Sequence, residues 1–362
     1  MTRIAILTPT VTTGDAVSND ALTMRRVLAA RGHDAQIYAE GWTVTEPAIR
    51  SIFDFGSFTG DGAHLLIYHH SIGWDAGFEE LRSARCKVAI KYHNITPPEF
   101  FAGISPAFEQ RCRNGKKQMQ EMARAGHALY LADSAYNLKE LLAEGVEKSN
   151  AFVVPPFHHA DRFSSLLADF DVLDSYRDDY ANVLMVGRVS PNKGHVALIE
   201  AFASYRYRYN SRSRLLIVGG EEVSFRDYSA HLRELIDLLW LQQAVVFTGE
   251  VSDAELKSYY LVSHVFATAS EHEGFCVPLV EAMAMNVPIV AYSSSAIPET
   301  VGDAGILWLQ SEPHLLAESI NFLMSDETSA MALCKQGRRR YEQFYENERI
   351  EKEFMRALGG VL

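Results

Sequence analysis

Short runs of apolar, β-branched residues alternate with helical stretches from the start of this chain, and this alternation constrains the fold more than any other feature. Gly, Asp, Asn or Pro bounds each run, which is typical of buried strands. Because the runs are continuously hydrophobic, we expect parallel strands that are covered on both faces. In the first half the predicted strands are Ile4–Thr8, Ala35–Tyr38, Leu65–His69, Val88–His93, Leu129–Ala132 and Phe152–Val154.

The pattern breaks at Pro155-Pro156 and restarts at Val183. The acidic, weakly periodic residues 158–180 are predicted to form a linker. The sequence therefore predicts an α/β protein with two doubly wound, Rossmann-like domains, residues 1–157 and 181–340, facing each other across a cleft. The predicted strands of the second domain are Val183–Val186, Leu215–Val218, Val245–Thr248, Val265–Thr268, Ile289–Tyr292 and Ile306–Leu309.

Residues 330–358 read as highly charged helix with scattered apolar positions. We expect these positions to let the last segment, residues 341–362, pack back on the first domain. The apolar residues in question are Tyr341, Phe344, Tyr345, Ile350, Phe354 and Leu358.

Composition narrows the class of protein. With 48% hydrophobic residues in 362, each domain can bury a core. The net charge of −12 argues against nucleic acid as a partner. The four cysteines have no paired spacing, which indicates reduced thiols and no structural zinc site. The apolar start is too short for a signal peptide and no apolar run reaches about 18 residues, so we expect a cytoplasmic protein.

Two carboxylates flank a loop-to-helix junction in the second half. Because Pro278 suits a first helical turn, a helix is predicted over Pro278–Met285, with Glu273 in the loop before it and Glu281 one turn inside. The N–H groups that open the helix lie at the positive end of its dipole, which favours a bound diphosphate. The residues assigned to this loop are Gly274, Phe275, Cys276 and Val277.

A second motif follows the first strand of the second domain, where Gly187-Arg188 precedes Lys193-Gly194. The two cations are separated by a Gly- and Pro-bounded turn, so both can converge on one diphosphate. Taken alone, an Arg and a Lys in such a loop are more often solvated. Their place at a strand end, in the same domain as Glu273, favours a functional role.

In the first half, polar residues also gather at strand ends. His93 ends the fourth predicted strand and precedes Pro97-Pro98, and we expect it to contact a transferred sugar or an acceptor. A lone His is more often a structural hydrogen-bonding residue. His69 and His70 have the same ambiguity and remain weaker acceptor-side candidates.

Two further signals bear on phosphate and metal. Gly14 follows the first strand and allows a close backbone approach to a phosphate, although such a Gly often serves only for turning. The Gly-x-Gly-x-x-Gly pattern of dinucleotide-binding domains is missing from the first loop of either half. Asp169-Phe170-Asp171 matches an Asp-x-Asp metal pattern, but it lies in the predicted linker. We therefore expect no metal and no cofactor.

The two glutamates with seven residues between them, the motif of Arg188 and Lys193, and the two restarting halves resemble a family 4 glycosyltransferase of the GT-B fold. Within that family, Tyr92-His93-Asn94-Ile95-Thr96-Pro97 and Tyr68-His69-His70-Ser71-Ile72-Gly73 resemble bacterial mannosyltransferase-like enzymes that build polysaccharide or O-antigen repeats. The resemblance implies transfer with retention of configuration and without a metal.

The resemblance also implies roles for single residues. Arg188 and Lys193 bind the donor diphosphate, Glu281 the ribose, and Glu273 the hydroxyls of the transferred sugar. The remaining assignments are Gly14 and Gly187 at the diphosphate, His93 beside the sugar ring, and Glu250 and Val251 at the base. One departure is Asp15, which stands where many members carry a second Gly and where a carboxylate would repel a diphosphate.

The hypothesis is a retaining, metal-independent hexosyltransferase that uses GDP-mannose, with a UDP-hexose next, to extend a glycan or lipid-linked glycan. Alternatives are a nucleotide-sugar epimerase of the same fold and a non-catalytic nucleotide-sugar-binding subunit. A basic cluster in the first half is either a solvated helix face or a contact with the anionic inner face of the plasma membrane. Its residues are Arg111, Arg113, Lys116 and Lys117.

Overall fold

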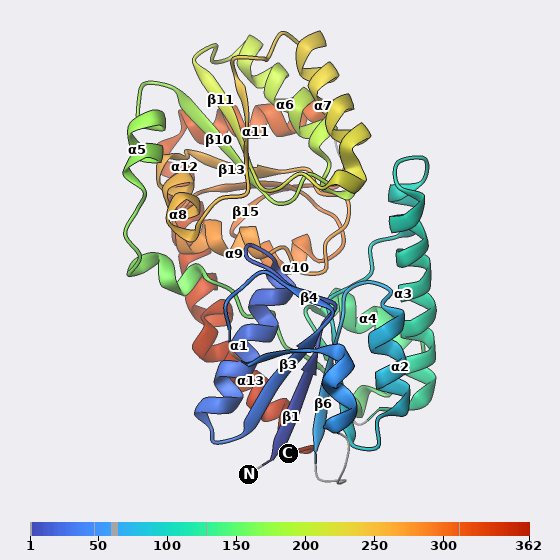
Figure 1. Cartoon of the computed structure of the whole chain (residues 1–362). Coiled ribbons are helices and arrows are strands. Elements are labelled where there is room, and N and C mark those ends of the chain that lie inside the picture. The colour runs from blue at the N-terminus through green and yellow to red at the C-terminus, as the bar shows by residue number, and fades with distance from the viewer. Residues whose placement is uncertain (1, 47, 59–63, 128, 311) are drawn as a thin grey trace. The chain divides into compact units, whose positions relative to one another are not determined.

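The structure, a computed structural model, describes residues 2–46, 48–58, 64–127, 129–310 and 312–362. It divides into two compact units (Figure 1). Each unit is built on a parallel sheet flanked by helices, which confirms the predicted α/β class. Unit 1 comprises Met1–Glu99, Ala107–His158 and Asn347–Leu362, and unit 2 comprises Phe100–Pro106 and His159–Glu346.

Unit 1 contains a seven-stranded sheet in the order β5-β3-β1-β6-β7-β8-β9. The six predicted strands are present within one or two residues, whereas β5 and the small β2–β4 ladder were missed because their apolar runs are too short to stand out. The strands are β1 (Arg3–Leu7), β2 (Thr10–Val11), β3 (Asp34–Ala39), β4 (Gly41–Trp42), β5 (Ile49–Ser51), β6 (Leu65–His70), β7 (Lys87–Tyr92), β8 (Leu129–Ala132) and β9 (Ala151–Val153).

Helices cover both faces of this sheet (Figure 1). On one face α1 and α13 share a core with the sheet, in which Leu28 and Phe354 are fully buried with Ile6 and Ile67. On the other face lie α2, α3 and α4. The helices are α1 (Ala16–Ala30), α2 (Asp75–Ser83), α3 (Pro106–Ala125), α4 (Ala135–Ala143) and α13 (Asn347–Leu358).

Unit 2 contains a six-stranded sheet in the order β12-β11-β10-β13-β14-β15, with a separate apolar core on each face. The strands are β10 (Ala181–Val186), β11 (Ser213–Val218), β12 (Val245–Gly249), β13 (Val265–Thr268), β14 (Ile289–Tyr292) and β15 (Gly305–Trp308). The helices are α5 (Phe170–Tyr176), α6 (His195–Arg208), α7 (Arg226–Leu238), α8 (Asp253–Val262), α9 (Val277–Ala284), α10 (Ile297–Val301), α11 (Pro313–Ser325) and α12 (Glu327–Arg340).

Of the stretch predicted as a linker, His158 belongs to unit 1, and residues 159–180 are instead part of unit 2. Phe163, Val172 and Leu173 are buried in one of its cores, so the acidic composition conceals an apolar face. Asp169 caps α5 by accepting a hydrogen bond from the Val172 N–H, at 3.0 Å. The acidic pattern around Asp169 therefore has a structural use.

The C-terminal segment divides between the two cores. Tyr341 and Tyr345 are buried in unit 2, and only after Glu346 does the chain join unit 1, where Ile350 and Phe354 are buried. A π-helical turn over Tyr341–Tyr345 ends α12, so one periodic pattern serves two cores. The expected packing on the first domain therefore holds from Asn347 onward.

Within the described residues, none of the helices combines the length and the apolar character that crossing a membrane requires.

Candidate functional site

The predicted site of unit 2 lies at the carboxyl ends of β10 and β13. These strands are neighbours at the point where the strand order of the sheet reverses, and ligands of open α/β sheets bind at such a point. Gly187-Arg188 follows β10, and Glu273 lies in the loop after β13. The fold therefore brings the two sequence motifs to one edge.

An ion pair joins these two loops. Lys193 Nζ lies 2.8 Å and 2.9 Å from the two carboxylate oxygens of Glu273, whose side chain is only 8% exposed. Gly194 fixes the turn that carries Lys193, because its φ is +66° and a Cβ there would lie 2.0 Å from the Ala269 carbonyl oxygen. The close approach of Gly194 thus places the ammonium group against Glu273.

The backbone around Glu273 is held by residues that the sequence did not single out. The Glu273 N–H donates to Ser295 Oγ at 2.7 Å, and Asn192 Nδ2 donates to the His272 carbonyl at 3.1 Å. Ser295 follows β14, the next strand of the sheet. Its position just after a predicted strand is the sequence signal that points to it. These contacts make the Glu273 loop a preorganised element.

Arg188 is placed differently from Lys193. It forms an ion pair with Glu222 and its side chain is 54% exposed. Each cation therefore pairs with its own carboxylate. The sequence had predicted two unpaired cations that converge on one diphosphate. Glu250 follows β12 and lies against Gly220, where a Cβ would approach the Glu250 side chain to 2.9 Å.

Helix α9 begins at Val277, one residue earlier than predicted, because Cys276 takes a left-handed conformation with φ of +72° and serves as the N-cap. The Cys276 thiol is buried, and burial together with the Glu273 carboxylate raises its pKa well above the usual range. The thiol is therefore neutral. It adds no negative charge at the helix start, where an anion was predicted.

Glu281 lies inside α9 and is buried. Burial raises its pKa to about 7, although a hydrogen bond from the Tyr260 hydroxyl, 2.8 Å from Glu281 Oε2, acts in the opposite direction. Tyr260 was not singled out from the sequence. Glu281 thus has a neighbour suited to hydrogen bonding, whereas Glu273 has a cation.

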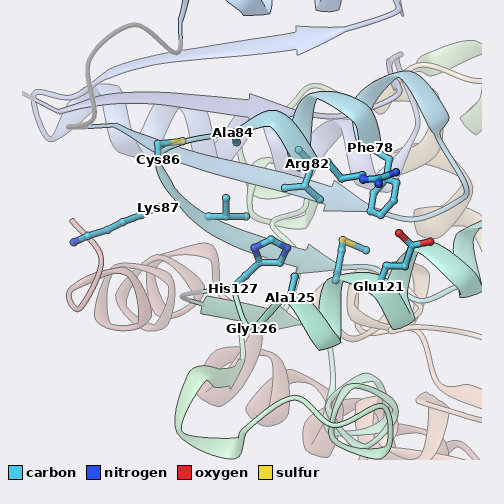
Figure 2. A pocket seen from close by; sticks show the side chains of 12 residues that line it. Phe78, Arg82, Ala84, Cys86, Lys87, Glu121, Ala125, Gly126 and His127 are labelled. Carbon is cyan, nitrogen blue, oxygen red and sulfur yellow. The ribbon is translucent and has the colours of Figure 1, made fainter.

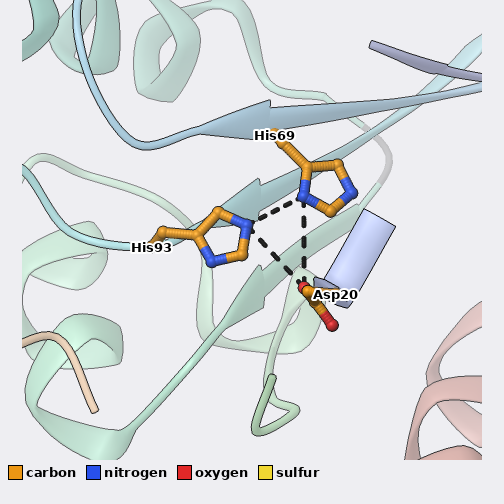
Figure 3. A group of neighbouring side chains, drawn as sticks. All are labelled: Asp20, His69 and His93. Carbon is orange, nitrogen blue, oxygen red and sulfur yellow. Dashed lines mark hydrogen bonds and ion pairs between the residues drawn. The ribbon is translucent and has the colours of Figure 1, made fainter. Parts of the chain in front are cut away.

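In unit 1, His93 belongs to a buried network at the ends of β6, β7 and β8. His93 Nδ1 lies 2.9 Å from Asp133 Oδ2, and His93 Nε2 lies 2.8 Å from His69 Nδ1. Lys91 Nζ lies 2.5 Å from Asp133 Oδ1 and 3.8 Å from Asp20 Oδ2. Figure 3 shows the two rings beside each other with Asp20 facing both.

Burial and charge shift several pKa values in this network. Burial raises the pKa of Asp20, against the effect of Lys91. Burial acts to raise the pKa of Asp133 as well, but the interactions of its carboxylate with His93 and Lys91 outweigh it and leave that pKa below the usual value. Burial, with the neighbouring His93 and Lys91, lowers the pKa of His69 well below its usual value. The network therefore contains the Asp133 carboxylate, the Lys91 ammonium group and an uncharged His69 ring.

Asp20, His69 and His93 also place three potential metal-ligand atoms within 4.8 Å of one another. The Lys91 ammonium stands beside this group and already supplies a positive charge to Asp20 and Asp133. The short contact between the two imidazole nitrogens has the length of a hydrogen bond. The chemistry of the group fits a hydrogen-bond network better than a cation site.

The first loop of unit 1 contains Gly14, which is exposed and has φ of +71°. Asp15 accepts hydrogen bonds from the N–H and hydroxyl of Ser18, at 2.9 Å and 2.7 Å, and so caps α1. His70 points elsewhere, with Nε2 at 2.9 Å from the Gly115 carbonyl. The sequence left the roles of Asp15 and His70 open. In the structure, Asp15 caps a helix and His70 forms a hydrogen bond to the backbone.

A separate hollow of about 470 Å³ lies in unit 1 between α2, the start of β7 and the end of α3 (Figure 2). Arg82, Lys87, Glu121 and His127 are among its lining residues. Lys87 begins β7, whereas His93 follows its other end. This hollow therefore lies at the opposite edge of the sheet and contains none of the predicted site residues.

Known proteins resemble the chain in two ways. Solved Anabaena Alr3699/HepE in complex with UDP and glucose has a TM-score of 0.78 and 17% identity, and the match covers 99% of this chain and 100% of that chain. This likeness shows the fold, which is GT-B. Residues 174–340 match the family model of glycosyl transferases group 1.

Among curated proteins, mannosylfructose-phosphate synthase of Agrobacterium fabrum is 28% identical over 173 residues, which are 45% of this chain and 37% of that protein. GDP-mannose-dependent alpha-(1-6)-phosphatidylinositol monomannoside mannosyltransferase of Mycobacterium tuberculosis is 28% identical over 196 residues, 51% of this chain and 49% of that protein. The chain thus matches about half or less of the length of these relatives.

Proposed function

We propose that the protein is a retaining, metal-independent glycosyltransferase that moves a hexose from a nucleoside-diphosphate sugar to a glycan or lipid-linked glycan. The ion pair between Lys193 and Glu273 carries this proposal. It places a cation that can bind a phosphate directly beside a carboxylate that can accept hydrogen bonds from sugar hydroxyls. Donor binding is assigned to unit 2.

The chemistry follows from where charge develops. When the bond to the sugar breaks, negative charge grows on the leaving diphosphate. Lys193, Arg188 and the N–H groups that begin α9 stabilise that charge, with Gly187 allowing close approach of the backbone. Fixed cations supply the positive charge that a metal supplies in other transferases. We assign attack by an acceptor hydroxyl on the same face as the departing phosphate, which takes up the hydroxyl proton, since no protein nucleophile was evident in the sequence.

The nucleoside is assigned to three residues of unit 2. Glu281 would accept hydrogen bonds from the ribose hydroxyls, and Glu250 and Val251 would flank the base. Two observations support this role. Glu281 is buried, and the Tyr260 hydroxyl donates a hydrogen bond to its carboxylate. Glu273 would bind the transferred sugar, next to the phosphate ligand Lys193.

GDP-mannose is the preferred donor and a UDP-hexose is second. One relative is named as GDP-mannose-dependent, whereas the HepE structure holds UDP and glucose. A thermal-shift panel of GDP, UDP, ADP and dTDP decides between them, because a ligand at 100 times its dissociation constant stabilises by about 2.7 kcal/mol. Stabilisation by GDP alone supports the preferred donor, and the same response to all four or to none contradicts the donor assignment.

Transfer itself separates the proposal from its alternatives. An epimerase on this fold would convert the donor without any acceptor, and a non-catalytic subunit would bind it without turnover. Incubation of labelled GDP-mannose or UDP-glucose with and without lipid-linked glycan distinguishes all three. Label that appears in the lipid fraction only when acceptor is present supports transfer, and its absence with every donor contradicts it.

We also propose that a lipid-linked acceptor is reached at an anionic membrane surface through α3. Its residues Arg111, Arg113, Lys116 and Lys117 are exposed, although Arg113 forms an ion pair with Glu109 at 2.6 Å. Charge reversal of Arg113, Lys116 and Lys117 should lower sedimentation with vesicles that contain anionic lipid. Unchanged sedimentation would remove the membrane contact and leave the transferase proposal standing. The cytoplasmic location stays a prediction.

A further inference from the structure

The hydrogen bonds of Asp133, His93 and His69, here called the imidazole chain, have only one arrangement of protons that fits neutral rings. Asp133 is a carboxylate and can only accept, so His93 Nδ1 carries a proton. His93 Nε2 must then accept, and His69 Nδ1 must donate to it. Both rings are therefore protonated on Nδ1.

Two further observations support this arrangement. Lys91 is fully buried beside Asp133, so a second buried cation on His93 would be unfavourable. His69 Nε2 is buried with no hydrogen-bond partner among the described residues. The proton arrangement gives that atom a lone pair instead of an N–H, and an unpaired acceptor is tolerated better than an unpaired donor.

The imidazole chain leaves His93 without a ring nitrogen for a substrate, because Nδ1 serves Asp133 and Nε2 serves His69. What the ring does is hold the turn that follows β7. The next residue, Asn94, has φ of +80°, a conformation that costs energy unless the surroundings fix it. Its side-chain amide donates to Asn137 Oδ1 and Glu140 Oε2, both at 2.8 Å. The turn is thus held on both sides.

We propose that Asp133 and His69 are positioning residues for the transfer step: they clamp the His93 ring in its Nδ1–H form and so fix the backbone turn at His93 and Asn94. This rests on the proposed function, together with the family resemblance that sets His93 beside the transferred sugar. The turn then acts through its backbone geometry, and the His93 ring acts as its anchor. Loss of the clamp slows transfer without weakening the hold of unit 2 on the donor.

The proton arrangement is tested by nitrogen-15 spectra of the full chain labelled at histidine. The expected result is that the rings of His69 and His93 are neutral and protonated on Nδ1. His69→Leu should remove the signal of His69. His70 serves as an internal reference, since its Nε2 faces the Gly115 carbonyl and should carry the proton. A doubly protonated His93 at neutral pH, or a stoichiometric bound metal by elemental analysis of the protein, overturns the inference.

The effect on the reaction is tested with two variants of His69 in the transfer assay. His69→Leu removes the donor to His93 and should lower kcat by roughly 10- to 100-fold, the scale of a small misplacement of reacting groups. The donor KM should stay within about twofold. His69→Asn retains an N–H donor near the position of Nδ1 and should recover most of kcat. His127→Gln, at the other edge of the sheet, is the matched control.

A second variant addresses folding and the carboxylate. Lys91→Met with Asp133→Asn removes both partners of the shortest buried ion pair together, so that of the two carboxylates near Lys91 only Asp20, 3.8 Å away, loses its cation. It should fold by circular dichroism and lower kcat as His69→Leu does. Wild-type kcat in His69→Leu overturns the inference while the transferase proposal stands. A wild-type protein that transfers no sugar overturns the proposed function instead, and the spectra still decide the proton arrangement.

Discussion

The two units treat charge in opposite ways. In unit 2, the Lys193–Glu273 and Arg188–Glu222 pairs reach the surface in part, so their charges remain available to a ligand. In unit 1, Lys91, Asp20 and Asp133 are buried, and their ion pairs lie within the unit. The difference teaches that exposed pairs suit recognition of a charged donor, whereas a closed network suits fixing a backbone.

The largest expected effect is on stability and separates the two kinds of pair. Lys91→Met leaves Asp133 and Asp20 buried without their cation, and it should lower the free energy of unfolding by about 3 to 5 kcal/mol. Lys193→Met breaks a pair whose lysine is partly exposed and should cost less than Lys91→Met, whose pair is closed off from solvent. Urea unfolding measures both. Equal losses would erase the contrast between the units.

The next effect is on catalysis. Lys193→Ala and Glu273→Gln should each lower transfer by on the order of 100-fold, because each removes a contact to charge or hydroxyls at the reacting centre. Lys335→Ala, an exposed lysine of the same unit, is the control and should leave transfer unchanged. Initial rates at saturating donor and acceptor give the comparison. Rates within a few-fold of wild type in both variants would show that the site has been misplaced.

A pH dependence is expected from Glu281, whose pKa of about 7 lies above the ordinary value of 4.5. In the free protein the folded state holds a proton between those values that the unfolded state has released. This contribution to stability therefore falls as pH rises from 4.5 to 7. Glu281→Gln should remove it, as thermal unfolding across that range would show. An unchanged pH profile in the variant would contradict the shifted pKa.

Glu281 should also shape donor binding. Its carboxylate accepts hydrogen bonds better when ionised, so affinity for a nucleotide sugar should rise from pH 6 to pH 8. A nucleotide sugar is the suitable probe because its diphosphate has no proton to lose in that range. Glu281→Gln should flatten the dependence in calorimetric titrations. A dependence that persists in the variant would assign it to another group.

The smallest effect concerns Arg188. Glu222→Gln frees the guanidinium from its carboxylate and should strengthen donor binding by no more than a few-fold, since exposed pairs contribute about 0 to 1 kcal/mol. The gain should shrink at high salt. Titrations at two salt concentrations check both statements. Weaker binding in Glu222→Gln would mean that Glu222 itself contacts the donor.

The sequence predicted the strands well because buried parallel strands are continuous apolar runs, and it singled out Lys193 and Glu273 as candidates because both lie in loops that follow such strands. It could not predict their ion pair, which depends on β10 and β13 being neighbours. The core role of residues 159–180 was missed because Phe163 and Leu173 are too widely spaced to form a run.

The imidazole chain was beyond sequence reasoning for a similar reason. Asp133, His93 and His69 come from three strands, and each alone resembles an ordinary structural polar residue. Only their convergence at one edge shows that they form a single network. His93 was therefore found as a candidate, while the residues that hold it were not all found.

One measurement tests the division between the units most directly: calorimetric titration of the donor identified by the nucleotide panel onto wild type, Lys193→Ala and His69→Leu. Lys193→Ala should weaken donor binding by about tenfold or more, which corresponds to about 1.4 kcal/mol. His69→Leu should bind within about twofold of wild type while its kcat falls. Equal weakening in both variants, or unchanged binding in Lys193→Ala, would contradict the account.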